Sequence, residues 1–288
     1  MSRRLLGTAL LSLLTLGCGQ GLETKYGVRT GVAAESVNGT SVLAEMFKQA
    51  GHAVSGATWA GPHLADNADV IVWFPDSLEA PASRQRRWFE DWLCQEPGRT
   101  LVYVGRDYDA APAYWKHALE LATLIQEEPV RRRLRKAEVR FDFERLAIPE
   151  RENCGWFTIL GKLQHRAVHE LSGDRGWVAG VDPKGVEIEL NGRVLPGKSA
   201  HALLVSKRDT LVSEKKFCSS KLLLVANGSF LLNFPLVNHE HRKLAGKLID
   251  SIGSNRRVTF LESGPQQLDI YDTEPENAGR SGLAILAT

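Results

Sequence analysis

Two short apolar segments, ADVIVWF at 68–74 and RTLVYVG at 99–105, constrain the fold of this chain most strongly. Their apolar residues follow one another without the polar alternation expected of a strand that has one face in water. A short continuous apolar run is typical of a strand in a parallel sheet that is covered on both faces. The two segments therefore predict neighbouring strands in the interior of such a sheet.

Amphipathic segments stand between the predicted strands. NGTSVLAEMFKQAG at 38–51 has the spacing of a helix that Asn38 or Thr40 caps and Gly51 ends. PASRQRRWFEDWLCQ at 81–95 has the same kind of pattern. Further strand-type segments are YGVRTGVA (26–33), HAVSGATW (52–59), KLLLVANGS (221–229) and RVTFLES (257–263). This alternation predicts an α/β fold with a doubly wound, mostly parallel sheet and right-handed crossovers.

The middle of the chain has a different character. Residues 111–146 have a helical pattern that ends in the charged stretch RRRLRKAEVRFDFER. From about 150 to 218, short β-type runs are separated by Gly, Asn-Gly and Asp-Pro turns, which predicts a small β-rich insertion. We expect one α/β domain over residues 19–263 that carries this insertion. The polar residues 264–288 are expected to form an extended or disordered tail.

The first eighteen residues, MSRRLLGTALLSLLTLGC, have the pattern of a targeting segment. Arg3 and Arg4 precede an apolar stretch that is too short to span a bilayer but suits a signal peptide. The closing Gly17-Cys18 pair resembles the lipobox of bacterial lipoproteins, although Thr15 stands where leucine is usual. The resemblance implies lipidation of Cys18 and an exported protein that is anchored to a membrane, in the periplasm or on the outer face. The alternative is an ordinary cleaved signal.

Composition limits the partners. A formal net charge of +2 argues against nucleic acid. Apart from Cys18, the three cysteines Cys94, Cys154 and Cys218 are widely spaced and form no zinc motif. They allow either one bridge with one free thiol or three buried thiols.

The sequence His239-Glu240-His241 in NFPLVNHEHRKLAG suggests a metal site at first sight. Asn238 is a good N-cap, however, and the following apolar spacing predicts a helix near 239–252. On a helix, His239 and His241 lie about 200° apart around the axis and cannot share one metal ion. We therefore expect no metal here, and interpret the segment as a polar helix start. A helix N-terminus at the carboxyl edge of a sheet still suits an anionic ligand.

Hydrolase motifs are absent from the sequence. No serine or cysteine follows RTLVYVG at the position of a nucleophile elbow, and Ser229 lacks the second glycine of GxSxG. The basic run at 131–136 suggests either contact with anionic lipid headgroups or a solvated helix face. The scattered tryptophans allow a third possibility, a carbohydrate-binding protein with exposed rings on its β-rich part.

Three segments together resemble an uncharacterised bacterial envelope family: residues 25–54, residues 68–77, and residues 222–253 with RVTFLES behind them. That family has a class I glutamine-amidotransferase-like α/β domain of unknown function, and it includes lipoproteins of planctomycete-type bacteria. The resemblance covers roughly Tyr26 to Ser263 and implies a flavodoxin-like fold. The amidotransferase Cys-His-Glu set has no match here, so the resemblance does not imply that activity. Some relatives resemble accessory parts of membrane transport or ATPase-linked envelope systems.

These observations favour a membrane-tethered, non-catalytic binding or adaptor protein of the cell envelope, with a protein partner and no cofactor. The alternative is a hydrolase or transferase with an unannounced site at the carboxyl edge of the sheet. Either function would use residues that follow a predicted strand or open a helix. These residues are Asn38, Thr40, Asp76, Ser77, Asp107, Asn227, Asn233, Asn238 and His239.

Overall fold

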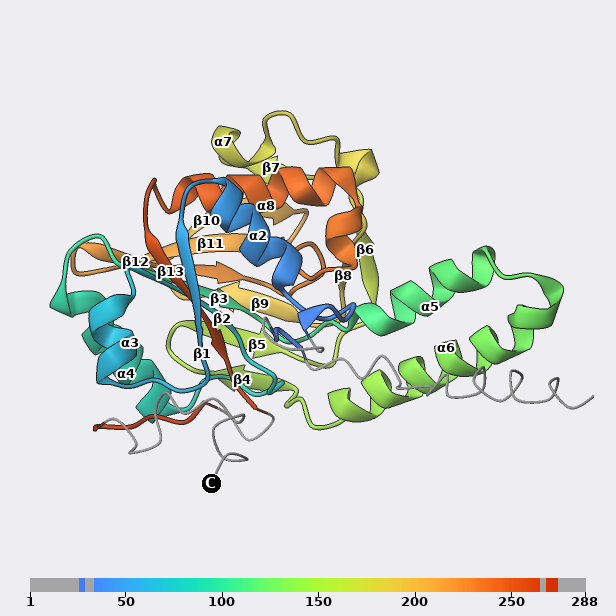
Figure 1. The fold of residues 1–288 in the computed structure, drawn as a ribbon, viewed down its shortest axis with the longest axis horizontal. Helices are drawn as coiled ribbons and strands as arrows, with labels where there is room; N and C mark the ends of the chain where they lie inside the picture. The colour runs from blue at the N-terminus through green and yellow to red at the C-terminus, as the bar shows by residue number, and fades with distance from the viewer. Residues whose placement is uncertain (1–25, 29–33, 265–267, 274–288) are drawn as a thin grey trace, which may run out of the picture.

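The computed structural model describes residues 26–28, 34–264 and 268–273. They form a mixed α/β fold around one eight-stranded sheet with the order β1-β13-β2-β3-β12-β11-β10-β7 (Figure 1). The parallel strands are β1 (Ala53–Ala57), β13 (Arg257–Glu262), β2 (Val70–Phe74), β3 (Thr100–Val104) and β12 (Ser220–Val225). The antiparallel strands are β11 (Asp209–Phe217), β10 (His201–Ser206) and β7 (Ser172–Gly173). The prediction of an α/β fold with a mostly parallel core sheet is confirmed.

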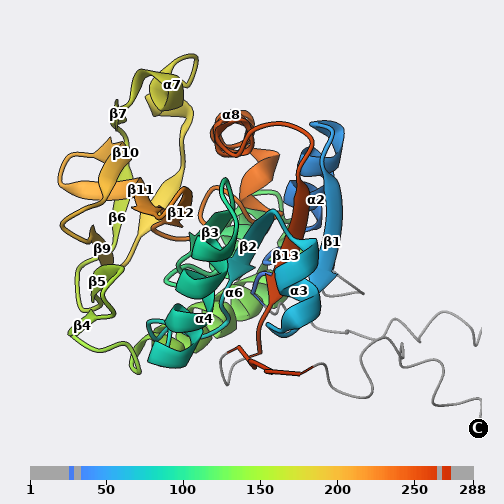
Figure 2. The same ribbon diagram turned by 90° about the vertical axis from the view of Figure 1, so that its left-hand side faces the viewer.

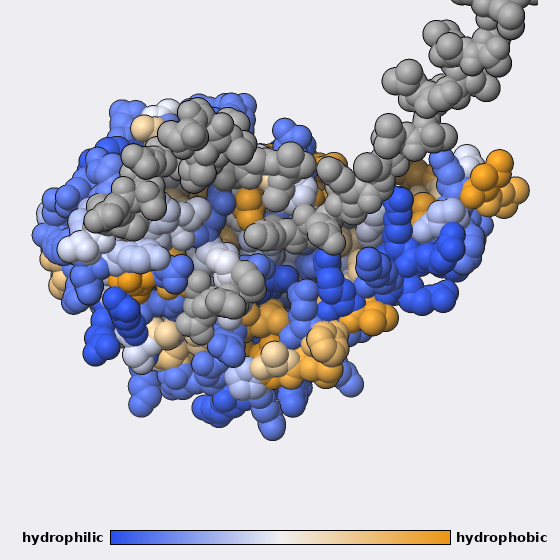
Figure 3. All heavy atoms as spheres, turned by 60° about the horizontal axis from the view of Figure 1, so that its bottom comes forward, coloured by the Kyte–Doolittle hydropathy of each residue, from blue (hydrophilic) through white to orange (hydrophobic). Residues whose placement is uncertain are grey.

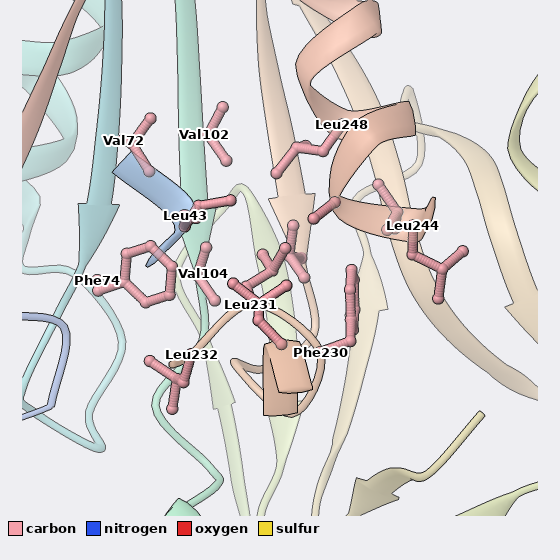
Figure 4. Close-up of a cluster of buried hydrophobic side chains, with 14 of the residues drawn as sticks. Leu43, Val72, Phe74, Val102, Val104, Phe230, Leu231, Leu232, Leu244 and Leu248 are labelled. Carbon is pink, nitrogen blue, oxygen red and sulfur yellow. The ribbon is translucent and has the colours of Figure 1, made fainter. Parts of the chain in front are cut away.

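The two central strands are buried on both faces, as their apolar runs predict. Along β2, Val72 and Phe74 face the helices α2 (Ser41–Gln49) and α8 (His239–Ser251), and Figure 4 shows them among leucines of both helices. Ile71 and Trp73 point to the opposite face, where α3 (Pro62–Asn67) and α4 (Ser83–Gln95) pack. Helices therefore cover both faces of the parallel strands.

The β-rich stretch divides into two parts. Its first part, apart from β7, forms two small sheets outside the main one. These sheets contain β4 (Arg151–Asn153), β5 (Phe157–Leu160) and β9 (Arg193–Pro196), and β6 (Arg166–Val168) with β8 (Ile188–Leu190). The short helices α7 (Arg175–Val178) and η1 (Pro183–Gly185) lie between β7 and β8. Its second part, β10 and β11, extends the main sheet, and Figure 2 shows both parts on one side of the molecule.

A helical hairpin projects from the body of the molecule (Figure 1). It consists of α5 (Ala110–Glu120) and α6 (Leu124–Arg145), which pack against each other. Ala137 and Phe141 are the buried residues of α6. No helix within the described ranges is long and apolar enough to cross a membrane.

Part of the polar tail packs on the domain. Leu268 is buried with the α3 and α4 side chains, and its carbonyl accepts a hydrogen bond from the Gln85 amide at 3.1 Å. Ile270 bridges to Ala60 as a short parallel pair. Residues 268–273 of the predicted tail therefore pack on the domain, because Leu268 has an apolar site to occupy. Residues 274–288 lie outside the described ranges, as do residues 29–33 of the first predicted strand.

A disulfide joins the end of α4 to the turn between β11 and β12. Cys94 and Cys218 form the bridge across 124 residues of sequence, and Cys154 is a buried free thiol. Of the alternatives that the cysteine count left open, the structure has one bridge and one thiol.

Replacing Cys94 and Cys218 together by alanine should lower the free energy of unfolding by about 2–5 kcal/mol, because the bridge restricts a long loop of the unfolded chain. Urea denaturation with and without reductant measures the loss. Cys154→Ala is the matched control, and its unfolding should stay sensitive to reductant. A wild-type stability that reductant leaves unchanged would contradict the bridge.

Candidate functional site

The carboxyl edge of the parallel sheet collects charged and polar side chains from three strands. Asp76 and Ser77 follow β2, Arg106 and Asp107 follow β3, and Asn227 follows β12. In an open α/β sheet this edge is where ligands bind. Here the first part of the β-rich stretch lies over it, since β5, β8 and β9 contribute Phe157, Leu190 and Val194 to the same enclosed space. These three side chains line the space with apolar surface.

Arg106 is the most connected residue of this edge. Its side chain is only 5% exposed, yet it contacts Asp76 at 3.4 Å and Glu144 of α6 at 3.1 Å. The guanidinium also donates to the Tyr108 carbonyl at 2.6 Å and lies 4.4 Å from the centroid of the Tyr26 ring. Burial raises the pKa of Glu144, and the charge of Arg106 opposes that rise. Arg106 thus joins the sheet, the N-terminal segment and the hairpin.

Asp107 points toward the β-rich part. Its carboxylate accepts a hydrogen bond from Arg145 Nε at 2.7 Å, and Arg145 also donates to the Gly161 carbonyl at 2.8 Å. Burial raises the pKa of Asp107, although the hydrogen bond from Arg145 lowers it in part. A Cβ atom at Gly192 would stand 2.4 Å from Asp107 Oδ2, so glycine is needed for the β8–β9 turn to approach this carboxylate.

A second group of charged residues lines the same space on the side of the β-rich part. Asp209 accepts hydrogen bonds from Arg166 at 2.8 Å and from Arg193 at 2.6 Å, and Arg166 also donates to the Gly192 carbonyl at 2.7 Å. Burial raises the pKa of Asp209, but the hydrogen bonds from the two arginines outweigh burial and the pKa is lowered. Asp209 therefore stays ionised and links β6, β9 and β11.

The space that these residues enclose is small. The cavity has a volume of about 30 Å³, and Ser77, Asp107 and Asn227 are among its lining residues. One water molecule needs roughly 10–15 Å³ by this measure, whereas sites for organic ligands measure about 300–1,000 Å³. The cavity therefore has room for one or two water molecules and none for an organic substrate.

Asn227 and Ser77 make local contacts within this edge. Asn227 donates to the Glu189 carbonyl at 2.8 Å, and its oxygen accepts from the Ser229 hydroxyl at 2.6 Å. The Ser77 hydroxyl accepts a hydrogen bond from the Glu79 amide at 3.2 Å. Neither serine hydroxyl has a histidine as a hydrogen-bond partner in the described part of the chain. The geometry therefore gives neither serine the base that a nucleophile needs.

Asn38 and Asn233 cap helices that are distant in sequence. Asn38 Oδ1 accepts from the Ala110 amide at the start of α5 at 2.7 Å, and its Nδ2 donates to Asp109 at 2.8 Å. Asn233 Oδ1 accepts from the Val42 amide in the first turn of α2 at 2.9 Å. Thr40 occupies the N-cap position of α2 as predicted, but its side chain makes no capping hydrogen bond to the helix. The Thr40 hydroxyl instead donates to the Gly27 carbonyl at 3.1 Å.

The helix that follows Asn238 begins as predicted. The Asn238 side chain accepts from the Glu240 amide at 2.8 Å, which caps α8. His239 is exposed on its first turn, while His241 is buried. The ring of His241 spans two backbone groups, the Pro235 carbonyl at Nδ1 and the Glu187 amide at Nε2, each at 2.9 Å. His241 therefore holds η2 (Pro235–Val237) and the β-rich part together.

The predicted site residues thus occupy different places. Ser77, Asp107 and Asn227 line the small cavity, and Asp76 contacts Arg106 beside it. Asn238 lines a separate open hollow of about 250 Å³ between α5, η2 and β8, together with His241. Asn38, Thr40 and Asn233 are used for capping and loop contacts. Among the described residues, no group of three or more His, Cys, Asp or Glu side chains could hold a metal ion.

Sequence reasoning missed most of the charged residues at this edge. The missed residues are Arg106, Arg145, Arg166, Arg193 and Asp209. Only Arg106 had a local signal, because it follows the buried strand directly. The carbohydrate-binding possibility required exposed rings on the β-rich part, but Trp156 and Trp177 are buried.

The low pKa of His241 predicts a loss of stability in acid. Burial lowers its pKa from 6.5 to about 4. Between these two values the unfolded chain binds more protons than the folded one, so acid favours unfolding. The contribution of neutral His241 to the free energy of unfolding is complete above pH 6.5. It is lost as the pH falls toward 4, by about 3 kcal/mol in all.

Urea unfolding across this pH range measures the slope in wild type and in His241→Gln, which cannot titrate. The slope should flatten in His241→Gln and remain in the matched control His239→Gln, whose ring is exposed. Equal slopes in the two variants would count against this role for His241.

Comparisons with known proteins add no function. No family model matches the chain, and no match was found among curated proteins. Among solved structures, a cytoplasmic protein from Salmonella typhimurium LT2 aligns over 58% of this chain with 12% identity and a TM-score of 0.27. The alignment spans 59% of that protein's length. A likeness this weak carries no argument about this chain.

Proposed function

We propose that this chain is an exported, lipid-anchored binding or adaptor protein of the bacterial cell envelope, without catalytic activity of its own. Lipid on Cys18 would hold it on a membrane, in the periplasm or on the outer face. Its domain would be a flavodoxin-like, doubly wound scaffold of the glutamine-amidotransferase-like kind. It would act through a protein partner, as an accessory to a membrane transport or ATPase-linked system.

The narrow cavity lined by Ser77, Asp107 and Asn227 at the carboxyl edge of the sheet is the observation that carries this proposal. An enzyme of this architecture needs a hollow there that admits a substrate, with a nucleophile and a base in reach of each other. The cavity here has a volume of about 30 Å³, and salt bridges to Arg106, Arg145 and Asp209 surround it. The arrangement suits a rigid scaffold whose outer surfaces bind partners.

Two further observations support export and the flavodoxin-like arrangement. The bridge between Cys94 and Cys218 suits an oxidising compartment, because disulfides persist outside the cytoplasm and are rare within it. Helices on both faces of a parallel sheet are a property of doubly wound folds. The targeting segment that includes Cys18 lies outside the described residues.

Replacing Cys18 by serine should move the protein from the membrane fraction to the soluble fraction of exported protein when the membranes are washed with high salt, which screens contacts to anionic headgroups. The reason is that serine cannot form the thioether through which the lipid is attached. Fractionation of a bacterial host and mass spectrometry of the N-terminal peptide measure the change. Cys154→Ser is the matched control, because Cys154 is a buried thiol of the folded domain.

The anchor would be disproved by a wild-type N-terminal peptide that carries no lipid on Cys18. Export would be disproved by wild-type protein found in the cytoplasm with Cys94 and Cys218 reduced.

A further inference from the structure

The end of the helical hairpin exposes three large apolar side chains. Leu121, Leu124 and Ile125 lie at the turn between α5 and α6, and their exposed fractions are 73%, 91% and 90%. Figure 3 shows the resulting hydrophobic surface at the far end of the projection. Burying a side chain of this size stabilises a protein by about 1.5–3 kcal/mol, so this cluster favours any apolar phase it can reach.

Unpaired cations follow the apolar end along α6. Arg132, Arg135 and Lys136 are exposed, and no ion pair is found for them within the described part of the chain. The neighbouring arginines have partners within the chain. Arg131 pairs with Glu127, and Arg133 lies over the Trp115 ring at 5.0 Å. The three remaining cations are therefore available to an external anion.

The spacing of the two features matches the layers of a membrane surface. Arg132 and Lys136 are seven and eleven residues beyond Ile125, which corresponds to about 10–17 Å along a helix. An apolar segment that enters a bilayer interface reaches about 5–10 Å into it, and basic side chains then meet the headgroup phosphates. We propose that the hairpin end (Leu121, Leu124 and Ile125) inserts into an anionic lipid bilayer, with Arg132, Arg135 and Lys136 on its phosphates.

The lipid anchor and the hairpin can reach the same surface, and on this point the inference rests on the proposed anchoring at Cys18. Eight peptide steps separate Cys18 from Tyr26, a reach of at most about 28 Å. Tyr26 lies at the root of the hairpin, because Arg106 contacts both its ring and Glu144 of α6. From that root, α6 extends 22 residues, or about 33 Å. The reach from Tyr26 to Cys18 is similar to the length of α6, so the lipid on Cys18 and the end of the hairpin can meet one membrane.

The root of the hairpin is fixed to the sheet, which favours insertion of a rigid element. Arg140 of α6 contacts Asp109 at 3.0 Å, and Asn38 holds the same carboxylate from the N-terminal segment. The hairpin is thus held at one end by buried polar contacts, and its other end carries the apolar cluster. A rigid hairpin loses little conformational entropy when its end enters a bilayer.

An environment-sensitive fluorophore on Leu124→Cys tests the insertion. The full chain would carry Cys18→Ser, so that the hairpin is measured without the anchor; Cys94 and Cys218 are bridged and Cys154 is buried, which leaves the new thiol for labelling. The probe should shift to an apolar spectrum with vesicles of phosphatidylcholine and phosphatidylglycerol, and far less with phosphatidylcholine alone. A probe on Phe143→Cys, exposed nearer the root, is the matched control and should stay aqueous.

Replacing Leu124 and Ile125 together by serine should weaken binding of the Cys18→Ser chain to the mixed vesicles by about 100-fold, because two large apolar contacts are lost. Replacing Arg132, Arg135 and Lys136 by glutamine should weaken it similarly and remove most of its salt dependence. The unfolding free energy of both variants would be measured alongside, and we expect it unchanged because all five side chains are exposed.

The inference and the proposed anchor fail in different ways. If a lipidated chain with Leu124→Cys is held on vesicles while its probe stays aqueous, the hairpin inference is wrong and the anchor stands. If mass spectrometry finds no lipid on Cys18 of the wild type, the anchor is wrong, and the vesicle result still decides the hairpin. A probe shift that depends on protein concentration without vesicles would identify a second copy as the occupant and overturn the inference.

Discussion

Arg106 brings a positive charge into the interior at the carboxyl edge of the sheet, and the surrounding structure depends on how that charge is satisfied. A buried guanidinium costs several kcal/mol unless its N–H groups find partners. Asp76, Glu144 and the Tyr108 carbonyl supply those partners, and the Tyr26 ring covers one face. The four groups come from the β2 loop, α6, the β3 loop and the N-terminal segment. Satisfying one side chain therefore fixes the relative positions of four segments.

The contacts at this edge support the proposal that the domain is a scaffold. The glycine at 192 lets the β8–β9 turn approach Asp107, and Asp209 joins three strands of the β-rich part through Arg166 and Arg193. What is left between the sheet and this part is a water-sized cavity. The hairpin root is held by the adjoining contacts of Asp109, and from this root the hairpin projects away from the body of the molecule.

Sequence patterns predicted those parts of the fold that depend on neighbouring residues. The strands at 70–74 and 100–104 follow from continuous apolar runs, and α8 follows from Asn238 with the apolar spacing behind it. Contacts between residues that are distant in sequence could not be predicted from local patterns. Asn233 caps α2 across 191 residues, and the side chain of Asn38 caps α5 across 72. Asparagine beside a helix start predicts a local cap, and only the folded chain shows that the amide faces another helix.

The position of the candidate site could be predicted from the sequence, but most of the charged side chains that converge there could not. Strand ends located Ser77, Asp107 and Asn227 at one cavity. Arg166, Arg193 and Asp209 lie within segments whose β-type pattern says nothing about which side chains converge. The pairing of β11 with β12 that brings Asp209 to this edge is set by the register of the whole sheet.

The most direct test of this account is the stability of Arg106→Met, measured by urea unfolding at neutral pH against the exposed control Arg84→Met. If Arg106 is the structural centre of a closed edge, its loss leaves Asp76 and Glu144 without their shared partner. The free energy of unfolding should then fall by about 3–5 kcal/mol, while the control changes by less than about 0.5 kcal/mol. A variant as stable as wild type, or more stable, would contradict the account. Such a result would identify Arg106 as a residue kept for a ligand at a cost in stability.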